Sequence, residues 1–376
     1  MQGSSPHLFA GGRLLALREK ALSEGLDGVL LLPGPNMRYF LGVSTESYER
    51  LTIALLSFKG SSSILVPRLD LERVGEQLAV GEMELFSYGD DEDPWLKVAS
   101  MLSRAGLEKG TVGVEGTMPF KVLTRLRVLG EGLALREIDP VFYELRAVKE
   151  EAELAAHRRA SAILQEAFMA TLADLREGME EREAAFLFRK RALELGAESV
   201  PFCLVQSGPD GAKPHLGPTA RRIGRGEPVV FDAGVTYDGY YADVTRTVCL
   251  GDPGDEAEKI FEAVLEAQSR ALEQVGPGVK AEQLDRAARG VIARRGYAQY
   301  FIHRTGHGLG LEVHEEPYIR EGSPTILKAG MIFTVEPGIY LPGRFGMRLE
   351  DDVVVTKAGC ENLTYLPKSL YIGDYL

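Results

Sequence analysis

The sequence predicts two domains of different class: an α/β domain over residues 1–140 and an α+β domain with a pseudo-twofold repeat over residues 141–376. Three observations support this prediction. Short apolar runs alternate with helical patterns in the first part, which is typical of α/β folds. Near Asp139-Pro140 the alternation ends, and a long stretch rich in Ala, Leu, Glu and Arg follows. The second part then repeats one helical motif.

The first domain begins with a predicted helix over 13–22 and a strand over 29–32 that ends at Pro-Gly-Pro-Asn. Apolar runs over 53–58 and 64–66, joined by Lys-Gly-Ser-Ser, indicate two strands in a hairpin-like connection. The pattern then predicts a helix over 69–78, a strand over 84–88, a helix over 95–105 and a strand over 112–115. No junction between a strand and a helix carries a glycine-rich phosphate loop, which argues against a nucleotide site.

The second domain repeats a segment that runs 18 residues from glycine to glycine, first from Gly178 to Gly196 and then from Gly278 to Gly296. A long helix is predicted before each copy, over 149–173 and over 256–274. Strands that carry histidines are expected after each copy: His215 after the first, and His303, His307 and His314 after the second. We expect the strands of both halves to form one shared sheet with the helices on one face. A chance match of helix-capping glycines is the alternative.

Composition and charge exclude several classes of protein. The net charge of −12 argues against a nucleic-acid partner, because such binding depends on clustered Lys and Arg. No apolar stretch approaches the roughly 18–20 residues that span a membrane, and residues 1–14 lack the apolar core of a signal peptide. The three cysteines, Cys203, Cys249 and Cys360, are widely spaced, which fits reduced thiols better than disulfides. A cytoplasmic protein is expected.

Asp232 and Asp243 lie on either side of an Asp238-Gly239 turn signal, so this segment is predicted to be a β-hairpin. A loop at Tyr237-Asp238 would place the two aspartates directly opposite each other. A loop at Asp238-Gly239 would make them diagonal neighbours on the same face. Two carboxylates held together require a proton or a metal ion to neutralise them. Two exposed aspartates near a turn are the alternative.

Three further residues fit a metal site. His307 lies in a glycine-rich segment that permits close approach of a ligand, although a hydrogen-bonded core histidine is the alternative. Glu336 ends an apolar strand, and Glu350 enters another; acids in such runs are rarely buried without partners. Surface exposure is a fair alternative for the neighbouring Asp351 and Asp352. Together the set offers four carboxylates and one imidazole, which balance two divalent ions such as Mn²⁺, Co²⁺, Fe²⁺ or Zn²⁺.

These motifs resemble those of the pita-bread metallopeptidases, the group that contains aminopeptidase P, prolidase (Xaa-Pro dipeptidase), methionine aminopeptidase and the metal-free creatinase. The motifs follow the family's order: Phe-Asp-Ala-Gly at 231–234, Ala-Asp-Val-Thr-Arg-Thr at 242–247, Gly-His-Gly-Leu-Gly-Leu-Glu-Val-His-Glu at 306–315, Thr-Val-Glu-Pro-Gly-Ile-Tyr at 334–340 and Arg-Leu-Glu-Asp-Asp at 348–352. The resemblance covers essentially the whole chain and implies a creatinase/prolidase-like N-terminal domain before a pita-bread catalytic domain.

The resemblance also implies a role for each site residue. Asp232 would hold one metal ion, His307 and Glu336 the other, and Asp243 and Glu350 would bridge both. Mn²⁺ is expected first, with Co²⁺ or Zn²⁺ as alternatives. Glu336 would act as general base. The residues implied to steady the substrate or to line the site are His215, His303, His314, Tyr340 and Arg348, for each of which structural packing is the alternative.

The implied activity is hydrolysis of the bond before proline in small peptides, by a homodimer. Xaa-Pro dipeptidase activity is favoured slightly over aminopeptidase P activity, because a large N-terminal domain would wall off the pocket. Tyr318 stands where prolidases often carry an arginine that binds the substrate carboxylate, so Arg320 or Arg38, the latter from a partner subunit, would replace it. Organophosphate hydrolysis is a possible side activity. A non-catalytic binding protein on the same fold is the distant alternative, and the retained ligands argue against it.

Overall fold

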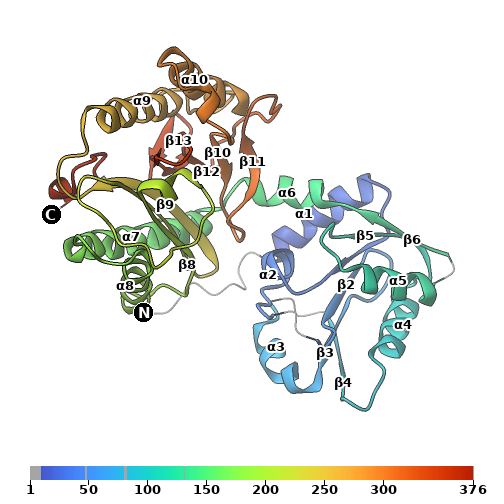
Figure 1. The fold of residues 1–376 in the computed structure, drawn as a ribbon. Helices are drawn as coiled ribbons and strands as arrows, with labels where there is room; N and C mark the ends of the chain where they lie inside the picture. The colour runs from blue at the N-terminus through green and yellow to red at the C-terminus, as the bar shows by residue number, and fades with distance from the viewer. Residues whose placement is uncertain (1–9, 47–48, 80–82, 131, 376) are drawn as a thin grey trace. The chain divides into compact units, whose positions relative to one another are not determined.

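The computed structural model describes residues 10–46, 49–79, 83–130 and 132–375 (Figure 1). The chain divides into two compact units, 1–146 and 147–376, each of which is considered by itself. The sequence places the boundary at residue 140, because Asp139-Pro140 resembles a linker. Asp139 instead begins helix α6 (Asp139–Ala147), whose first turn accepts a proline because the nitrogen there needs no helical partner.

The N-terminal unit is built on a six-stranded mixed sheet in the order β4-β3-β2-β1-β5-β6. Its strands are β1 (Gly28–Leu31), β2 (Ile53–Ser57), β3 (Ser63–Pro67), β4 (Glu84–Tyr88), β5 (Lys109–Val114) and β6 (Gly132–Glu137). Its helices are α1 (Ala10–Ser23), α2 (Pro35–Leu41), α3 (Leu71–Gln77), α4 (Pro94–Arg104), α5 (Phe120–Leu129) and α6. The predicted strands and helices of this part are confirmed, and β2 and β3 pair antiparallel as expected.

The second unit confirms the predicted repeat. Helices α7 (Glu151–Asp174) and α8 (Glu181–Glu194) form the first pair, and α9 (Asp255–Leu272) and α10 (Ala281–Arg294) form the second. The four glycines that bound the copies all have positive φ, from 82° to 97°, a conformation that glycine adopts without steric cost. In Figure 1 the strands of this unit lie between the two helix pairs.

The predicted single shared sheet is not what the structure has. Hydrogen bonding gives a three-stranded sheet, β7-β8-β9, a five-stranded sheet, β11-β10-β12-β15-β16, and a β13-β14 hairpin. The strands are β7 (Ser199–Ser207), β8 (Pro228–Tyr237), β9 (Tyr240–Cys249), β10 (Gly306–Gly308), β11 (Glu315–Ile319), β12 (Ile332–Val335), β13 (Gly338–Leu341), β14 (Phe345–Arg348), β15 (Asp351–Val355) and β16 (Cys360–Asn362). The halves are joined where the Glu350 N–H donates to the Thr245 carbonyl at 3.1 Å.

The histidines were also expected on strands, and only His307 is on one, β10. His215, His303 and His314 lie in the connecting segments, and for His215 the preceding proline ends the local strand pattern.

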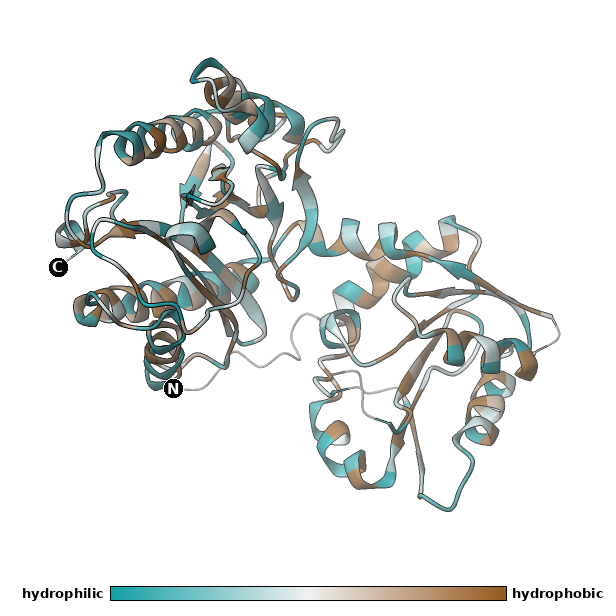
Figure 2. Ribbon diagram, viewed as in Figure 1, coloured by the Kyte–Doolittle hydropathy of each residue, from teal (hydrophilic) through white to brown (hydrophobic). Residues whose placement is uncertain are grey.

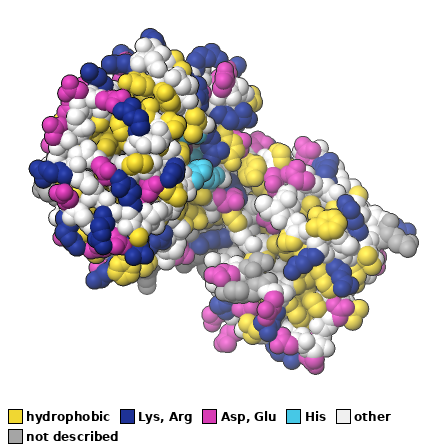
Figure 3. Space-filling model, viewed as in Figure 1, with side chains coloured by type: hydrophobic (Ala, Val, Ile, Leu, Met, Phe, Trp, Pro, Cys, Tyr) yellow, Lys and Arg dark blue, Asp and Glu magenta, His cyan; other side chains and the backbone are white. Residues whose placement is uncertain are grey.

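Apolar contacts attach the first helix pair to its sheet. The Phe231 ring on β8 packs edge-on against Phe168 of α7, at 4.7 Å between centroids, and against Phe188 of α8, at 5.7 Å. Figure 2 shows the resulting pattern, with hydrophobic and hydrophilic residues alternating around the helices of this unit. Within the described residues, no helix combines the length and apolarity needed to cross a membrane. The face shown in Figure 3 carries interspersed basic and acidic side chains.

His157 of α7 makes stability depend on pH. Its ring is buried, and Nδ1 lies 2.7 Å from the Tyr241 carbonyl oxygen. Burial, with a smaller contribution from Lys149, lowers its pKa from 6.5 to about 3. Because the folded-state pKa lies below the unfolded value, the stability present above about pH 6.5 is lost as the pH falls.

Because of this histidine, we expect the free energy of unfolding to fall by about 2 kcal/mol when the pH is lowered from about 7.5 to about 5. The variant His157→Gln keeps an N–H donor toward Tyr241. Its free energy of unfolding should fall by about 2 kcal/mol less than that of the wild type over the same pH interval. Urea denaturation of both proteins at the two pH values measures the difference. Parallel pH profiles would show that His157 does not carry this dependence.

Candidate metal centre

The β8–β9 hairpin brings two acids to one face of the sheet. Its loop is Asp238-Gly239, with φ of 49° and 76°, which matches a tight turn with left-handed central residues. Asp232 therefore pairs with Thr245, and Asp243 pairs with Gly234. Of the two predicted registers, the diagonal one is correct and the directly opposite one is wrong. Both side chains still share one face, because alternate residues of a strand point the same way.

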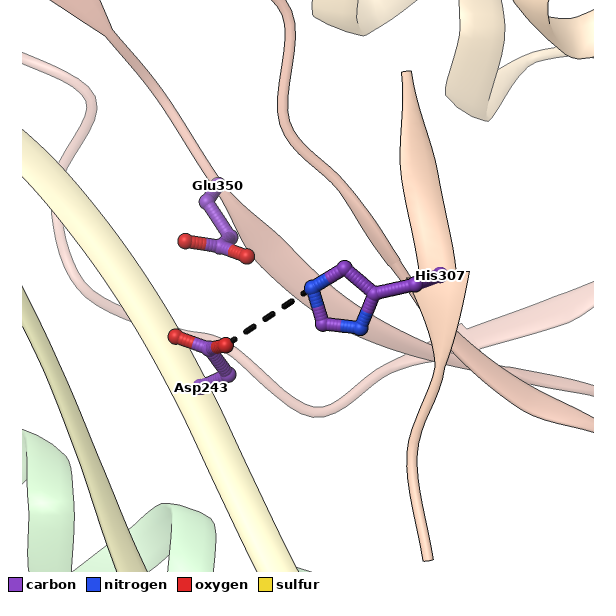
Figure 4. Close-up of side chains that lie close together, drawn as sticks. All are labelled: Asp243, His307 and Glu350. Carbon is purple, nitrogen blue, oxygen red and sulfur yellow. Dashed lines mark ion pairs between the residues drawn. The ribbon is translucent and has the colours of Figure 1, made fainter. Parts of the chain in front are cut away.

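Three other strands bring the remaining ligand candidates to this face. His307 Nε2 lies 3.4 Å from Glu336 Oε1 and 3.8 Å from Asp243 Oδ2. Asp243, His307 and Glu350 each offer one ligand atom, and these atoms lie within 4.8 Å of one another. Figure 4 shows the three side chains converging from separate segments. The sequence signals for these four acids and one histidine thus led to residues that line one pocket.

Glycines allow β10 to approach its neighbours. A Cβ at Gly306 would overlap the carbonyl oxygen of Thr334 on β12, and a Cβ at Gly308 would lie 2.5 Å from that of Glu316. The glycine-rich motif is therefore needed to bring the His307 backbone against both β11 and β12.

The electrostatics of the cluster favour a bound cation. Burial raises the pKa of Asp243 and of Glu350, and the neighbouring carboxylates raise both further. Burial also raises the pKa of Glu336, to about 7, and lowers that of His307, which keeps its imidazole neutral. Asp232 Oδ1 and Asp243 Oδ1 are buried and have no hydrogen-bond partner among the described residues. Carboxylate oxygens without partners and a neutral imidazole nitrogen fit a divalent metal ion.

Neighbouring side chains hold the ligand candidates in place. Thr245 Oγ1 donates to Glu350 Oε2 at 2.6 Å, and Arg348 donates to Asp232 Oδ2 at 2.6 Å and to Thr245 Oγ1 at 3.0 Å. The Asp243 N–H donates to Asp352 Oδ2 at 3.0 Å. Sequence analysis did not single out Thr245, and no local signal distinguishes it from an ordinary strand residue.

Surface exposure, the alternative considered for Asp351 and Asp352, does not hold. Both are buried, at 0% and 1% exposure. Asp351 forms ion pairs with Arg246 at 2.8 Å and with Lys368 at 2.6 Å. Its partners come from distant parts of the chain, so a run of acids at the start of a strand gave no sign of them. Asp351 therefore points away from the pocket into a buried ion pair.

The ligand candidates line a cavity of about 460 Å³, a size that suits a small molecule. His215, His303, His314 and Arg348 also line it, as does Arg304, which sequence analysis did not single out. Phe202, Leu204, Pro214 and Val313 supply an apolar wall.

Three of the predicted outer residues, His303, Tyr340 and Arg348, form one hydrogen-bonded chain beside the cavity. The Tyr340 hydroxyl lies 2.8 Å from His303 Nε2 and accepts from Arg348 at 2.8 Å. Burial lowers the pKa of His303 to about 3, so its ring is neutral. His314 packs its ring edge-on against His307, with centroids 4.2 Å apart, and His215 faces the same cavity. Tyr340 does not line the cavity itself, and it acts through Arg348, which binds Asp232.

Comparison with known proteins agrees with this geometry. Residues 155–357 match the model of metallopeptidase family M24, and residues 13–148 match the creatinase/prolidase N-terminal domain. The chain belongs to metallopeptidase family M24. It is therefore a metallopeptidase with the pita-bread fold that the sequence motifs predict, and membership of the family implies that it binds divalent metal.

The similarity to known relatives extends over nearly the whole of this chain. It is 38% identical to the "Probable dipeptidase PepE" of Mycobacterium tuberculosis, covering 96% of both chains. It is 35% identical to the "Xaa-Pro dipeptidase" of Pyrococcus horikoshii, covering 92% of this chain and 95% of that one. Among solved structures, a prolidase from Thermococcus sibiricus matches with a TM-score of 0.91 and 39% identity, covering 96% of this chain and 98% of the other.

Proposed function

We propose that this M24 protein is a two-metal Xaa-Pro dipeptidase. The observation that carries the proposal is the convergence of four carboxylates, three of them buried and that of Glu336 partly exposed, and one neutral histidine in a cavity of dipeptide size. The names of the Pyrococcus and Thermococcus relatives support the choice of substrate. The apolar wall of Phe202, Leu204 and Val313 suits a pyrrolidine ring, which offers no N–H and needs no acceptor.

In this proposal Asp232, Asp243, His307, Glu336 and Glu350 hold two divalent ions, with Mn²⁺ first and Co²⁺ or Zn²⁺ as alternatives. Bound there, the ions would lower the pKa of water and polarise the scissile carbonyl. The partnerless oxygens of Asp232 and Asp243 support this assignment.

The protein's own groups then orient the peptide and move the proton. Glu336 lines the cavity, with Oε1 3.4 Å from His307 Nε2, and would act as the general base. His215 and His314 line the cavity and would steady the substrate carbonyl. Arg348, fixed by Tyr340 and Thr245, keeps the Asp232 carboxylate aimed at the site. The homodimeric state and the cytoplasmic location are further parts of the proposal.

A second candidate function is removal of the first residue from longer Xaa-Pro peptides. An X-Pro aminopeptidase from Thermotoga maritima matches with a TM-score of 0.82 and 33% identity, covering 94% of this chain and 99% of that one. The same centre therefore suits either substrate length. How the protein binds the C-terminal end of the peptide determines which length it prefers.

Release of the N-terminal residue from Xaa-Pro and from Xaa-Pro-Xaa distinguishes the two functions. We expect kcat/KM for the dipeptide to exceed that for the tripeptide by roughly tenfold or more, equivalent to about 1.4 kcal/mol. Matched peptides with alanine in place of proline serve as the control for proline preference. Faster turnover of the tripeptide would identify an aminopeptidase P and contradict the proposed dipeptidase.

A further inference from the structure

Arg304 is a cation in the cavity with no partner of opposite charge. It lies between His303 and the start of β10, and it lines the cavity together with the ligand candidates. Among the described residues, its guanidinium has no carboxylate within ion-pair distance and donates no hydrogen bond. The other arginine that lines the cavity, Arg348, is engaged by Asp232, Tyr340 and Thr245. Arg304 is therefore available to an anion in the cavity, whereas Arg348 is not.

Tyr318 holds Arg304 in place. The guanidinium carbon of Arg304 lies 4.4 Å from the centroid of the Tyr318 ring, a cation–π arrangement. Tyr318 is on β11, which pairs antiparallel with β10 through Gly306 and Ile319. This pairing brings the two residues together although they are far apart in sequence. Stacking on a planar ring leaves the N–H groups at the edge of the guanidinium free to donate to a carboxylate.

Charge balance indicates what Arg304 binds. Two divalent ions would balance the four carboxylates of the centre, so none of these carboxylates is left to neutralise Arg304. A free dipeptide differs from a longer peptide by a carboxylate one residue beyond the scissile bond. We propose that Arg304, held on the face of Tyr318, binds the C-terminal carboxylate of the dipeptide substrate. This inference rests on the proposed dipeptidase function.

Arg304 takes the place that the sequence assigned to Arg320 or Arg38. Arg320 is exposed, donates to the Glu321 carbonyl and does not line the cavity. Arg38 lies on α2 of the N-terminal unit. Tyr318 occupies the position where a carboxylate-binding arginine was expected, and in this chain it supports an arginine from the segment before the neighbouring strand β10 instead.

The test compares an Xaa-Pro dipeptide with its C-terminal amide, which lacks the negative charge. The wild-type holoenzyme should prefer the dipeptide by roughly tenfold or more in kcat/KM, as expected for a charge-assisted hydrogen bond. Arg304→Met should raise KM for the dipeptide and remove this preference, while Arg304→Lys keeps part of it. Tyr318→Phe should retain the preference and Tyr318→Leu should weaken it, because only phenylalanine keeps the ring. Arg320→Met is the matched control and should behave as wild type.

The ratio of the two substrates separates carboxylate binding from a general effect of Arg304 on the site. A loss that is equal for dipeptide and amide in both Arg304 variants would overturn the inference, while Xaa-Pro hydrolysis by the wild type would still stand. Loss of the preference in Arg320→Met would overturn it as well. Failure of the wild-type holoenzyme to cleave any Xaa-Pro dipeptide would refute the proposed function, and the inference with it. Thermal unfolding of each variant verifies that it is folded.

Discussion

Asp243→Asn and Glu350→Gln are each expected to abolish metal-dependent turnover. Both carboxylates are buried beside His307, and the proposed role of each is to bind two ions at once. An amide offers one neutral oxygen where the carboxylate offers two charged ones, so at least one ion should be lost. We expect kcat/KM to fall by roughly a thousandfold or more, about 4 kcal/mol of transition-state stabilisation. Elemental analysis and peptide assays after reloading with Mn²⁺ or Co²⁺ measure both effects.

Asp238→Asn is the matched control for these variants. It makes the same chemical change in the same hairpin, at an exposed turn residue whose φ of 49° asparagine tolerates. It should keep full metal content and activity. Asp351→Asn is a poor control, because Asp351 is buried in ion pairs and its replacement should affect folding. Unchanged metal content and rate in Asp243→Asn and Glu350→Gln would show that the centre lies elsewhere.

Thermal unfolding with and without metal distinguishes a loss of metal binding from a loss of folding in the Asp243→Asn variant. In the metal-free protein Asp243 is buried near Glu350, and one of its oxygens has no partner. Asparagine cannot carry the negative charge that an aspartate would bring to this buried position. The unfolding temperature of the metal-free variant should therefore equal or exceed that of the metal-free wild type. Added metal should stabilise the wild type more than the variant, because each ion that binds only the folded protein contributes about 2.7 kcal/mol when its concentration is a hundred times Kd. Destabilisation of the metal-free variant would instead indicate a structural role.

Elements with a clear apolar pattern could be predicted from the sequence, whereas α2 and β6 could not. The repeated helices α7 to α10 follow from their apolar spacing and their glycines. Helix α2 was missed because it has only seven residues and begins in Pro-Gly-Pro-Asn, which resembles a loop. Strand β6 was missed because its residues are mostly half-exposed or exposed, which leaves a weak apolar pattern. Local sequence also cannot show that the two halves form separate sheets, because pairing depends on partners far along the chain.

The chemistry of the site was more predictable than its register. Acids at the ends of apolar strands identified Glu336 and Glu350, since such residues are rarely buried without a partner. The hairpin signal identified Asp232 and Asp243. The hairpin loop had two candidate positions, and only the backbone conformation of Asp238-Gly239 decided between them. Contacts between distant segments were invisible in the sequence. The clearest example is Arg246, whose partners are up to 121 positions away.

Replacing Arg246 by methionine is expected to destabilise the catalytic unit by about 3–5 kcal/mol, because the change leaves buried partners without a donor. Arg246 is completely buried. Its guanidinium donates to the carbonyls of Pro367, Thr245, Glu350 and Leu366 and to Asp351 Oδ1, at 2.7 to 3.1 Å. It thereby ties β9, the start of β15 and the C-terminal segment together immediately behind Thr245 and Glu350. Lysine preserves the charge but cannot reproduce five donors in a fixed planar arrangement, so Arg246→Lys should also lose stability.

Arg158→Met provides the matched control for Arg246→Met. Arg158 also pairs with a carboxylate across the fold, donating twice to Glu361 at 2.8 and 2.9 Å, but its side chain is 37% exposed. Exposed pairs contribute about 0–1 kcal/mol, so this variant should unfold close to wild type in urea. The contrast arises because water can solvate Glu361 once its partner is gone, whereas no water reaches the carbonyls around Arg246. Equal midpoints for the two variants would show that burial does not set the importance of Arg246.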